Sequence, residues 1–185
     1  MNKEQLQRVK HQIADRNRRF DKMTDSQKRV TIARDVIKIL EGEMLGITMK
    51  AQNMTYFITS ASIYSHLTPE LELRNALIGE QCTVCALGAA FTGAVMRSNN
   101  LTLGKLPCGV TNIIMRQYLN QWFSTRTLLM IEAAFETNAS FAWSPACSKQ
   151  DARRAADFGE NFAKAHDRLI AIMENIIKNN GEFIP

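Results

Sequence analysis

Residues 82–97 read Cys-Thr-Val-Cys-Ala-Leu-Gly-Ala-Ala-Phe-Thr-Gly-Ala-Val-Met-Arg and combine a Cys-x-x-Cys spacing with a run of small apolar residues. Small residues let helices approach closely, and a reduced cysteine packs as a small apolar side chain. Gly88 and Gly93 each cost about 1 kcal/mol in a helix interior relative to alanine, so they need a reason such as close packing or a ligand near the backbone. The stretch predicts a tightly packed central helix over 82–97, with Cys82 and Cys85 on one face.

The spacing of Cys82 and Cys85 is also found in metal and redox sites. A structural zinc site needs four ligands, and the other two cysteines, Cys108 and Cys147, each stand alone instead of forming a second pair. A thioredoxin-like motif follows a strand in a βαβ unit, and the residues before Cys82 do not indicate one. Packing is the favoured interpretation, and we expect no metal, no cofactor and no catalytic residue. A site made of all four cysteines stays open.

The composition is typical of a globular protein, with 185 residues of which 45% are hydrophobic and 22% charged. This length suits a single domain over 1–185. The sequence contains no run of about 18 apolar residues and no signal-peptide pattern, so we expect a cytoplasmic protein with reduced cysteines and no membrane partner. The net charge is +5, and residues 1–38 hold eleven Lys or Arg against five acids. This excess indicates either a solvated helix face or a basic, mobile arm over 1–20 that meets an acidic partner.

A helical period of apolar residues predicts a mainly α-helical domain of six or seven helices. Thr24 begins a capping box with Gln27 ahead of one of them. β-forming residues predict one short hairpin near 47–59, which must lean on the helices. After the last helix, Phe183 is expected to fold back onto it. The other predicted helices span 3–18, about 70–77, 82–97, 111–122, 124–135 and a long final segment of about 149–179, which we expect to grip the central helix.

Two kinds of side chain are candidates for binding, because the histidines and acids form no recognisable catalytic or metal motif. Aromatic residues on a predicted loop, Phe141 and Trp143, are typical of interface anchors. Arginines lie on the basic arm, where they would meet an acidic partner, and on or beside predicted helices, where their guanidinium groups would bind phosphates through paired hydrogen bonds. These arginines are Arg16, Arg18, Arg19, Arg97, Arg116 and Arg126.

Three ordered blocks carry a resemblance: IARDVI at 32–37, CxVCALGAxF at 82–91 and MENIIxNxGxFxP at 173–185. In these blocks the chain resembles a family of small uncharacterised proteins found in bacteriophages and some bacteria. The resemblance implies a phage accessory protein of the host cytoplasm that inhibits or sequesters a host factor, in antiviral defence, without catalysis. The residues themselves leave two alternatives: a sponge that binds a nucleotide second messenger, and a DNA-binding protein that uses its basic N-terminal segment. The oligomeric state stays open.

Overall fold

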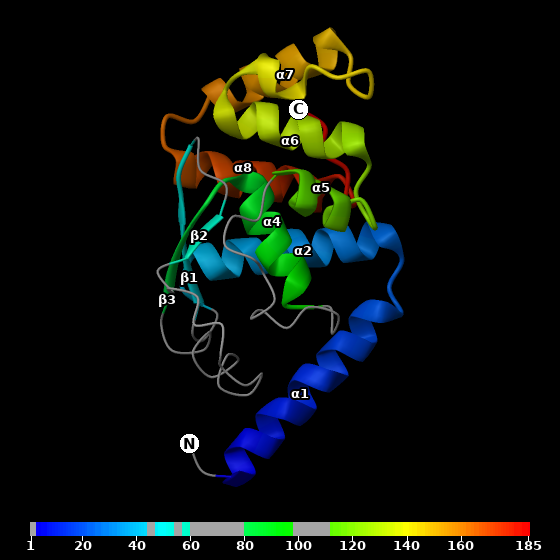
Figure 1. Ribbon diagram of the computed structural model, residues 1–185, viewed down its shortest axis with the longest axis vertical. Coiled ribbons are helices and arrows are strands. Elements are labelled where there is room, and N and C mark those ends of the chain that lie inside the picture. The colour runs from blue at the N-terminus through cyan, green and yellow to red at the C-terminus, as the bar shows by residue number, and fades with distance from the viewer. Residues whose placement is uncertain (1–2, 44–46, 54–56, 60–79, 98–111) are drawn as a thin grey trace.

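The computed structural model describes residues 3–43, 47–53, 57–59, 80–97 and 112–185 and confirms a mainly α-helical protein (Figure 1). The strands are β1 (Ile47–Ala51), β2 (Phe57–Thr59) and β3 (Glu80–Val84). The helices are α1 (Lys3–Asp21), α2 (Asp25–Leu40), α4 (Ala86–Val95), α5 (Asn112–Leu119), α6 (Thr125–Glu136), the 3-10 helix η2 (Ala139–Ala142), α7 (Lys149–Glu160) and α8 (Ala165–Lys178). The helix predicted at about 70–77 lies outside the described residues.

Local capping signals begin two helices where the sequence predicts them. The Thr24 hydroxyl accepts a hydrogen bond from the backbone N–H of Gln27 at 3.3 Å, and the Gln27 side chain accepts one from the Thr24 N–H at 3.0 Å. Ser124 caps α6 by accepting from the N–H of Thr127 at 3.1 Å. Each cap contributes about 1 kcal/mol to the stability of its helix. Both signals are local in sequence, which is why they can be found without the fold.

The hairpin predicted near 47–59 is wrong in its pairing, although both of its strands exist. β3 lies between β1 and β2 in a three-stranded sheet of order β1-β3-β2. β1 runs parallel to β3 with Met49 opposite Cys82, and β2 runs antiparallel to β3 with Phe57 opposite Val84. A two-stranded ribbon is marginal on its own, and the third strand supplies the pairing that it lacks.

The helix predicted over 82–97 is helical only from Ala86 onward. Cys82 belongs to β3, and Cys85 is the N-cap residue of α4, where its Sγ accepts a hydrogen bond from the N–H of Gly88 at 3.4 Å. Residues 80–84 form a strand because β3 pairs with β1 on one side and β2 on the other. The spacing of the cysteines, which suggests a helix, does not determine the structure here. The two cysteines therefore do not share a helix face, which corrects the prediction.

α4 is nevertheless the packed centre of the molecule, because all of its residues are buried. It packs against α2, α5, α6 and β1, and Figure 1 shows it crossing α2. A Cβ atom at Gly93 would lie 3.2 Å from the carbonyl oxygen of Ile32, so close packing of α2 accounts for this glycine. Gly88 is also buried, and its carbonyl accepts a hydrogen bond from the Thr92 hydroxyl at 2.8 Å. The C-terminal helix is predicted to pack around the central helix, but α8 packs mainly on α2, α6 and β1.

The long final helix predicted over 149–179 is two helices, α7 and α8, joined by a short connection. The Asn161 side chain ends α7 by donating to two backbone carbonyls of its last turn at 3.1 and 3.2 Å. The buried Arg168 then donates to the carbonyl oxygens of Phe162 at 2.8 Å and Phe135 at 2.6 Å. A buried carbonyl without a donor costs about 1–3 kcal/mol, so this arginine stabilises the break and fixes it against α6.

The chain end folds back onto α8 as predicted. The N–H of Gly181 donates to the carbonyl oxygen of Ile176 at 2.7 Å, and Gly181 takes a left-handed φ of 94°. Phe183 is buried, and its ring meets the edge of Phe158 with 5.4 Å between centroids. These contacts pack the C-terminal residues against α8 and α7.

α1 leaves the rest of the fold at an angle to α2 and projects from it (Figure 1). Its last turn is anchored by Phe20, which is buried and packs edge-on against Trp122 with 5.6 Å between ring centroids. Asn17, one turn earlier, is also buried. This anchored end sets the angle at which the basic residues of α1 face α2.

Candidate functional site

A concave surface, which we call the basic cleft, lies between α1, α2 and the turn after α4. Its volume is about 470 Å³. Five of its lining side chains are cationic and two are acidic, a net charge of +3. The lining residues are Asp15, Arg16, Arg19, Met23, Thr31, Arg34, Asp35, Lys38 and Arg97.

Helical spacing explains why so many cations face one another there. Arg16 and Arg19 are three residues apart on α1, and Arg34 and Lys38 are four apart on α2. Residues at these spacings lie on one face of a helix, so each helix presents a basic face to the cleft. Arg97 comes from the turn that follows α4.

One ion pair joins two walls of the basic cleft. Arg97 donates to Asp35 from Nε at 2.5 Å and from Nη2 at 2.6 Å, which is the two-pronged geometry of a strong guanidinium–carboxylate pair. Asp35 is buried, so this pair ties α2 to the end of α4. The second acid of the cleft, Asp15, pairs with Arg18 one turn along α1. Both carboxylates are therefore engaged by arginine.

Arg16 is held in an unfavourable environment for its charge. Its Nη2 donates to the carbonyl oxygen of Met96, but its Nε is buried without a hydrogen-bond partner among the described residues. Burial lowers the pKa of Arg16, and the positive charge of Arg97 lowers it further, against the opposing effect of Asp35. An anion beside Arg16 would relieve both the desolvation and the repulsion.

Three other cations of the cleft are exposed. The side chains of Arg19, Arg34 and Lys38 make no hydrogen bond or ion pair within the part of the chain that the structure describes. Sequence reasoning named Arg19 but missed Arg34 and Lys38. Their four-residue spacing on the predicted second helix was the available signal, because it places both on one face.

The remaining predicted arginines do not reach the basic cleft. Arg18 lies on α1 but is not among the lining residues. Arg116 pairs with the buried Glu132 at 2.7 Å, and Arg126 pairs with Asp151 at 3.0 Å. Because these carboxylates neutralise them, Arg116 and Arg126 are poor candidates for binding a phosphate.

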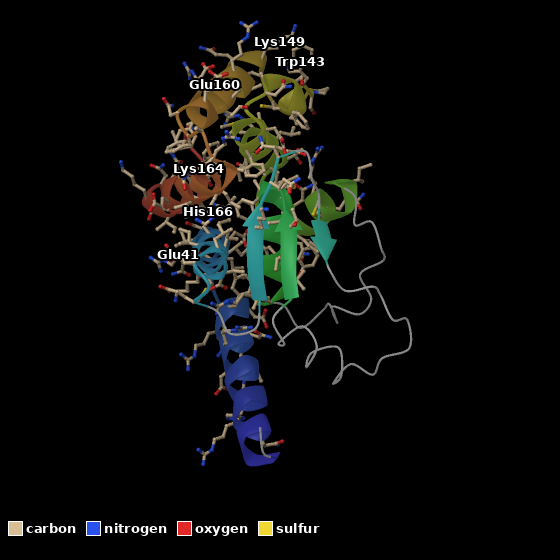
Figure 2. The ribbon with its side chains drawn as sticks, turned by 90° about the vertical axis from the view of Figure 1, so that its left-hand side faces the viewer. Glu41, Trp143, Lys149, Glu160, Lys164 and His166 are labelled. Atoms are coloured by element: carbon tan, nitrogen blue, oxygen red, sulfur yellow. The ribbon has the colours of Figure 1, made fainter. Side chains whose placement is uncertain are left out.

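The two predicted aromatic anchors differ in exposure. Phe141 lies in η2 and is half-buried, whereas the Trp143 side chain follows η2 and is 67% exposed. Figure 2 shows Trp143 at the end of the molecule opposite α1. The predicted binding residues therefore divide into a basic group near α1 and an aromatic one far from it.

Neither of the two cysteines whose side chains the structure describes, Cys85 and Cys147, has an activated thiol, because burial raises the pKa of both. Cys85 is buried, and burial raises its pKa to about 11, so the thiol stays protonated near neutral pH. A strand does precede Cys85, unlike the sequence interpretation, but redox chemistry needs a lowered thiol pKa. Cys108 and the Cys82 side chain lie outside the described residues, so a four-cysteine site stays open. In the described residues, no three His, Cys, Asp or Glu side chains gather to hold a metal.

A buried carboxyl on α6 makes stability depend on pH. Burial raises the pKa of Glu132 to about 7, although Arg116 opposes the shift. In the unfolded chain Glu132 releases its proton near the ordinary pKa of about 4.5. The contribution of Glu132 to the stability of the fold is therefore greatest below that pH and falls as pH rises towards 7. The loss amounts to about 3 kcal/mol.

Glu132→Gln is expected to remove this dependence. Urea unfolding of both proteins between pH 5 and pH 8 measures it: the wild type should lose about 2–3 kcal/mol relative to the variant over that range. Parallel pH profiles for the two proteins would show that Glu132 is already ionised in the folded state.

No helix in the described part of the chain combines the length and the apolar character that a membrane span needs. Comparisons with protein-family models, with curated proteins and with solved structures find no match.

Proposed function

We propose that this protein binds, without catalysis, a phosphorylated small molecule of nucleotide size in the basic cleft. One observation carries the proposal: four cations, Arg16, Arg19, Arg34 and Lys38, line one concave surface whose two carboxylates are already engaged. Such a surface attracts anions, and arginine forks match the geometry of phosphate oxygens.

The size of the cleft favours a small ligand over a nucleic-acid duplex. Its volume of about 470 Å³ lies within the range of small-molecule sites. A duplex is usually met by an extended positive surface that follows two phosphate strands. DNA binding through the basic face of α1 is the competing proposal, and the same titration tests it.

The chemistry of the lining supports sequestration of a ligand over its conversion. Thr31 carries the one hydroxyl in the part of the lining that the structure describes, and it donates to the carbonyl oxygen of Gln27 at 2.8 Å. Each carboxylate of the cleft is already paired with an arginine, so neither is available as a general base. A phage protein of this kind would act by sequestering a host nucleotide. This activity would fit the role in antiviral defence that the resemblance implies.

Calorimetric titration at low salt tests the proposal with ATP, a cyclic dinucleotide and a short single-stranded DNA as probes. We expect saturable binding of a phosphorylated small molecule with one site per chain, and a matching rise in the melting temperature. Binding should weaken as salt is added, since the interaction is between charges. Binding of the DNA alone, or of none of the probes at millimolar concentration, would contradict the proposal.

A second candidate is docking of a host protein through Trp143. The observation that favours it is the 67% exposure of this large side chain, since exposed tryptophans often anchor interfaces. Trp143→Ala should then abolish co-purification of a stoichiometric partner from bacterial lysate. Ile184→Ala is the matched control, because Ile184 is 59% exposed and apolar. Equal recovery of the partner with both variants would rule out this role for Trp143.

A further inference from the structure

We infer that the basic cleft recognises a chain of phosphates, the triphosphate class, and largely ignores the group attached to it. The inference rests on the proposed function, which it makes more specific. It follows from the juxtaposition of four cations on two helices, Arg16 and Arg19 facing Arg34 and Lys38, with no aromatic side chain among the described residues of the lining.

The charge balance of the cleft sets the charge of the ligand. Asp35 is neutralised by Arg97, so this pair contributes little net charge. Asp15 is paired with Arg18, which lies outside the lining. The four remaining cations suit the roughly four to five negative charges of a fully ionised triphosphate, whereas a phosphodiester carries a single negative charge for each phosphate.

The uncharged lining offers little to a nucleobase. Among the described residues of the lining, only Met23 and Thr31 are uncharged, and the Thr31 hydroxyl is already engaged. Sites that read bases commonly stack them on aromatic rings and bind their edges with amides. Without such groups in the described lining, affinity must come from the phosphates.

Arg16 supplies a donor that a phosphate chain would use. Its buried Nε has no hydrogen-bond partner within the described residues, while its Nη2 is taken by the Met96 carbonyl. An unpaired buried donor is costly, and a phosphate oxygen is a strong acceptor for it. Burial and Arg97 both lower the pKa of Arg16, which agrees with a site that is strained without an anion.

The carboxylates of the cleft also indicate whether the triphosphate binds with or without Mg²⁺. Mg²⁺ bound to a triphosphate usually keeps one or two protein carboxylates as ligands. Asp15 and Asp35 are both engaged by arginine, so the described lining has no free carboxylate to offer. The metal-free anion should therefore bind more tightly than its magnesium complex.

The test is a calorimetric series with EDTA present: phosphate, pyrophosphate and tripolyphosphate beside AMP, ADP and ATP. We expect affinity to rise roughly tenfold with each added phosphate, and tripolyphosphate to match ATP within a few-fold. Excess Mg²⁺ should weaken ATP binding about tenfold. Equal affinity for AMP and ATP, or ATP far tighter than tripolyphosphate, would overturn this inference and leave the proposed function standing. Binding of none of the six would refute both.

Arg16→Lys tests the role assigned to Nε. The variant keeps the charge but removes the Nε donor, so affinity for tripolyphosphate should fall several-fold while that for phosphate changes little. Arg8→Lys is the matched control, because Arg8 is exposed on the same helix and is not among the lining residues, and it should change neither. An Arg16→Lys variant that binds tripolyphosphate like the wild type would show that Nε does not meet the ligand.

Discussion

Gly159→Ala, which adds a single methyl group, is expected to lower the free energy of unfolding by about 3 kcal/mol or more. A Cβ atom at Gly159 would lie 1.8 Å from the carbonyl oxygen of Ala134, and backbone atoms cannot yield as a flexible side chain can. α6 and α7 would have to separate, and the buried contacts between them would loosen. Urea or thermal unfolding measures the loss.

Gly42→Ala is the control for this prediction. Gly42 has a left-handed φ of 72°, but nothing lies within 4 Å of a Cβ built there. This variant should lose only the backbone cost of about 1 kcal/mol. If the two variants unfold at the same denaturant concentration, α6 and α7 do not pack as closely as described.

Charge reversal in the basic cleft is expected to abolish ligand binding with little effect on the fold. Arg19→Glu combined with Arg34→Glu replaces two exposed cations, one on each helix, by two anions. Affinity for tripolyphosphate should fall about 100-fold or more, since the net charge of the lining falls from +3 to −1. Calorimetry gives the affinity, and circular dichroism verifies that the helices persist.

The matched control carries the same charge change at the far end of the molecule. Arg153 and Arg154 are exposed on α7, which Figure 1 shows at the opposite end from α1. The double change Arg153→Glu and Arg154→Glu alters the net charge equally but leaves the cleft intact. Equal loss of affinity in both double variants would mean that the overall charge, not the cleft, attracts the ligand.

The parts of the fold that the sequence predicts are those with local causes. The capping box at Thr24 and the cap at Ser124 need only residues three positions away, and both are confirmed. The pairing of β1 with β3 joins residues more than thirty positions apart. The i, i+3 spacing of Cys82 and Cys85 suggests a helix where β3 lies. The break before α8 depends on Arg168 reaching a carbonyl of α6, which no local pattern reveals.

The candidate site could be predicted only in part for the same reason. The sequence identifies Arg16 and Arg19 as cations of a basic arm and Arg97 as a cation for a phosphate, and the fold brings these three to one cleft. It also names Arg116 and Arg126, which the fold places beside carboxylates. Which arginines are neutralised depends on contacts between helices distant in the chain, so spacing alone cannot separate the two groups.

The side-chain NMR signals of the arginines test the central claim most directly. Each Nε–Hε pair gives its own signal, and substitution to lysine assigns it. On addition of tripolyphosphate the Arg16 signal should move and saturate with one equivalent of ligand, because its Nε gains the partner that it lacks. The Arg126 signal should stay in place, since that side chain pairs with Asp151 outside the cleft. An unmoved Arg16 signal in a protein that binds tripolyphosphate would contradict the assignment of the basic cleft.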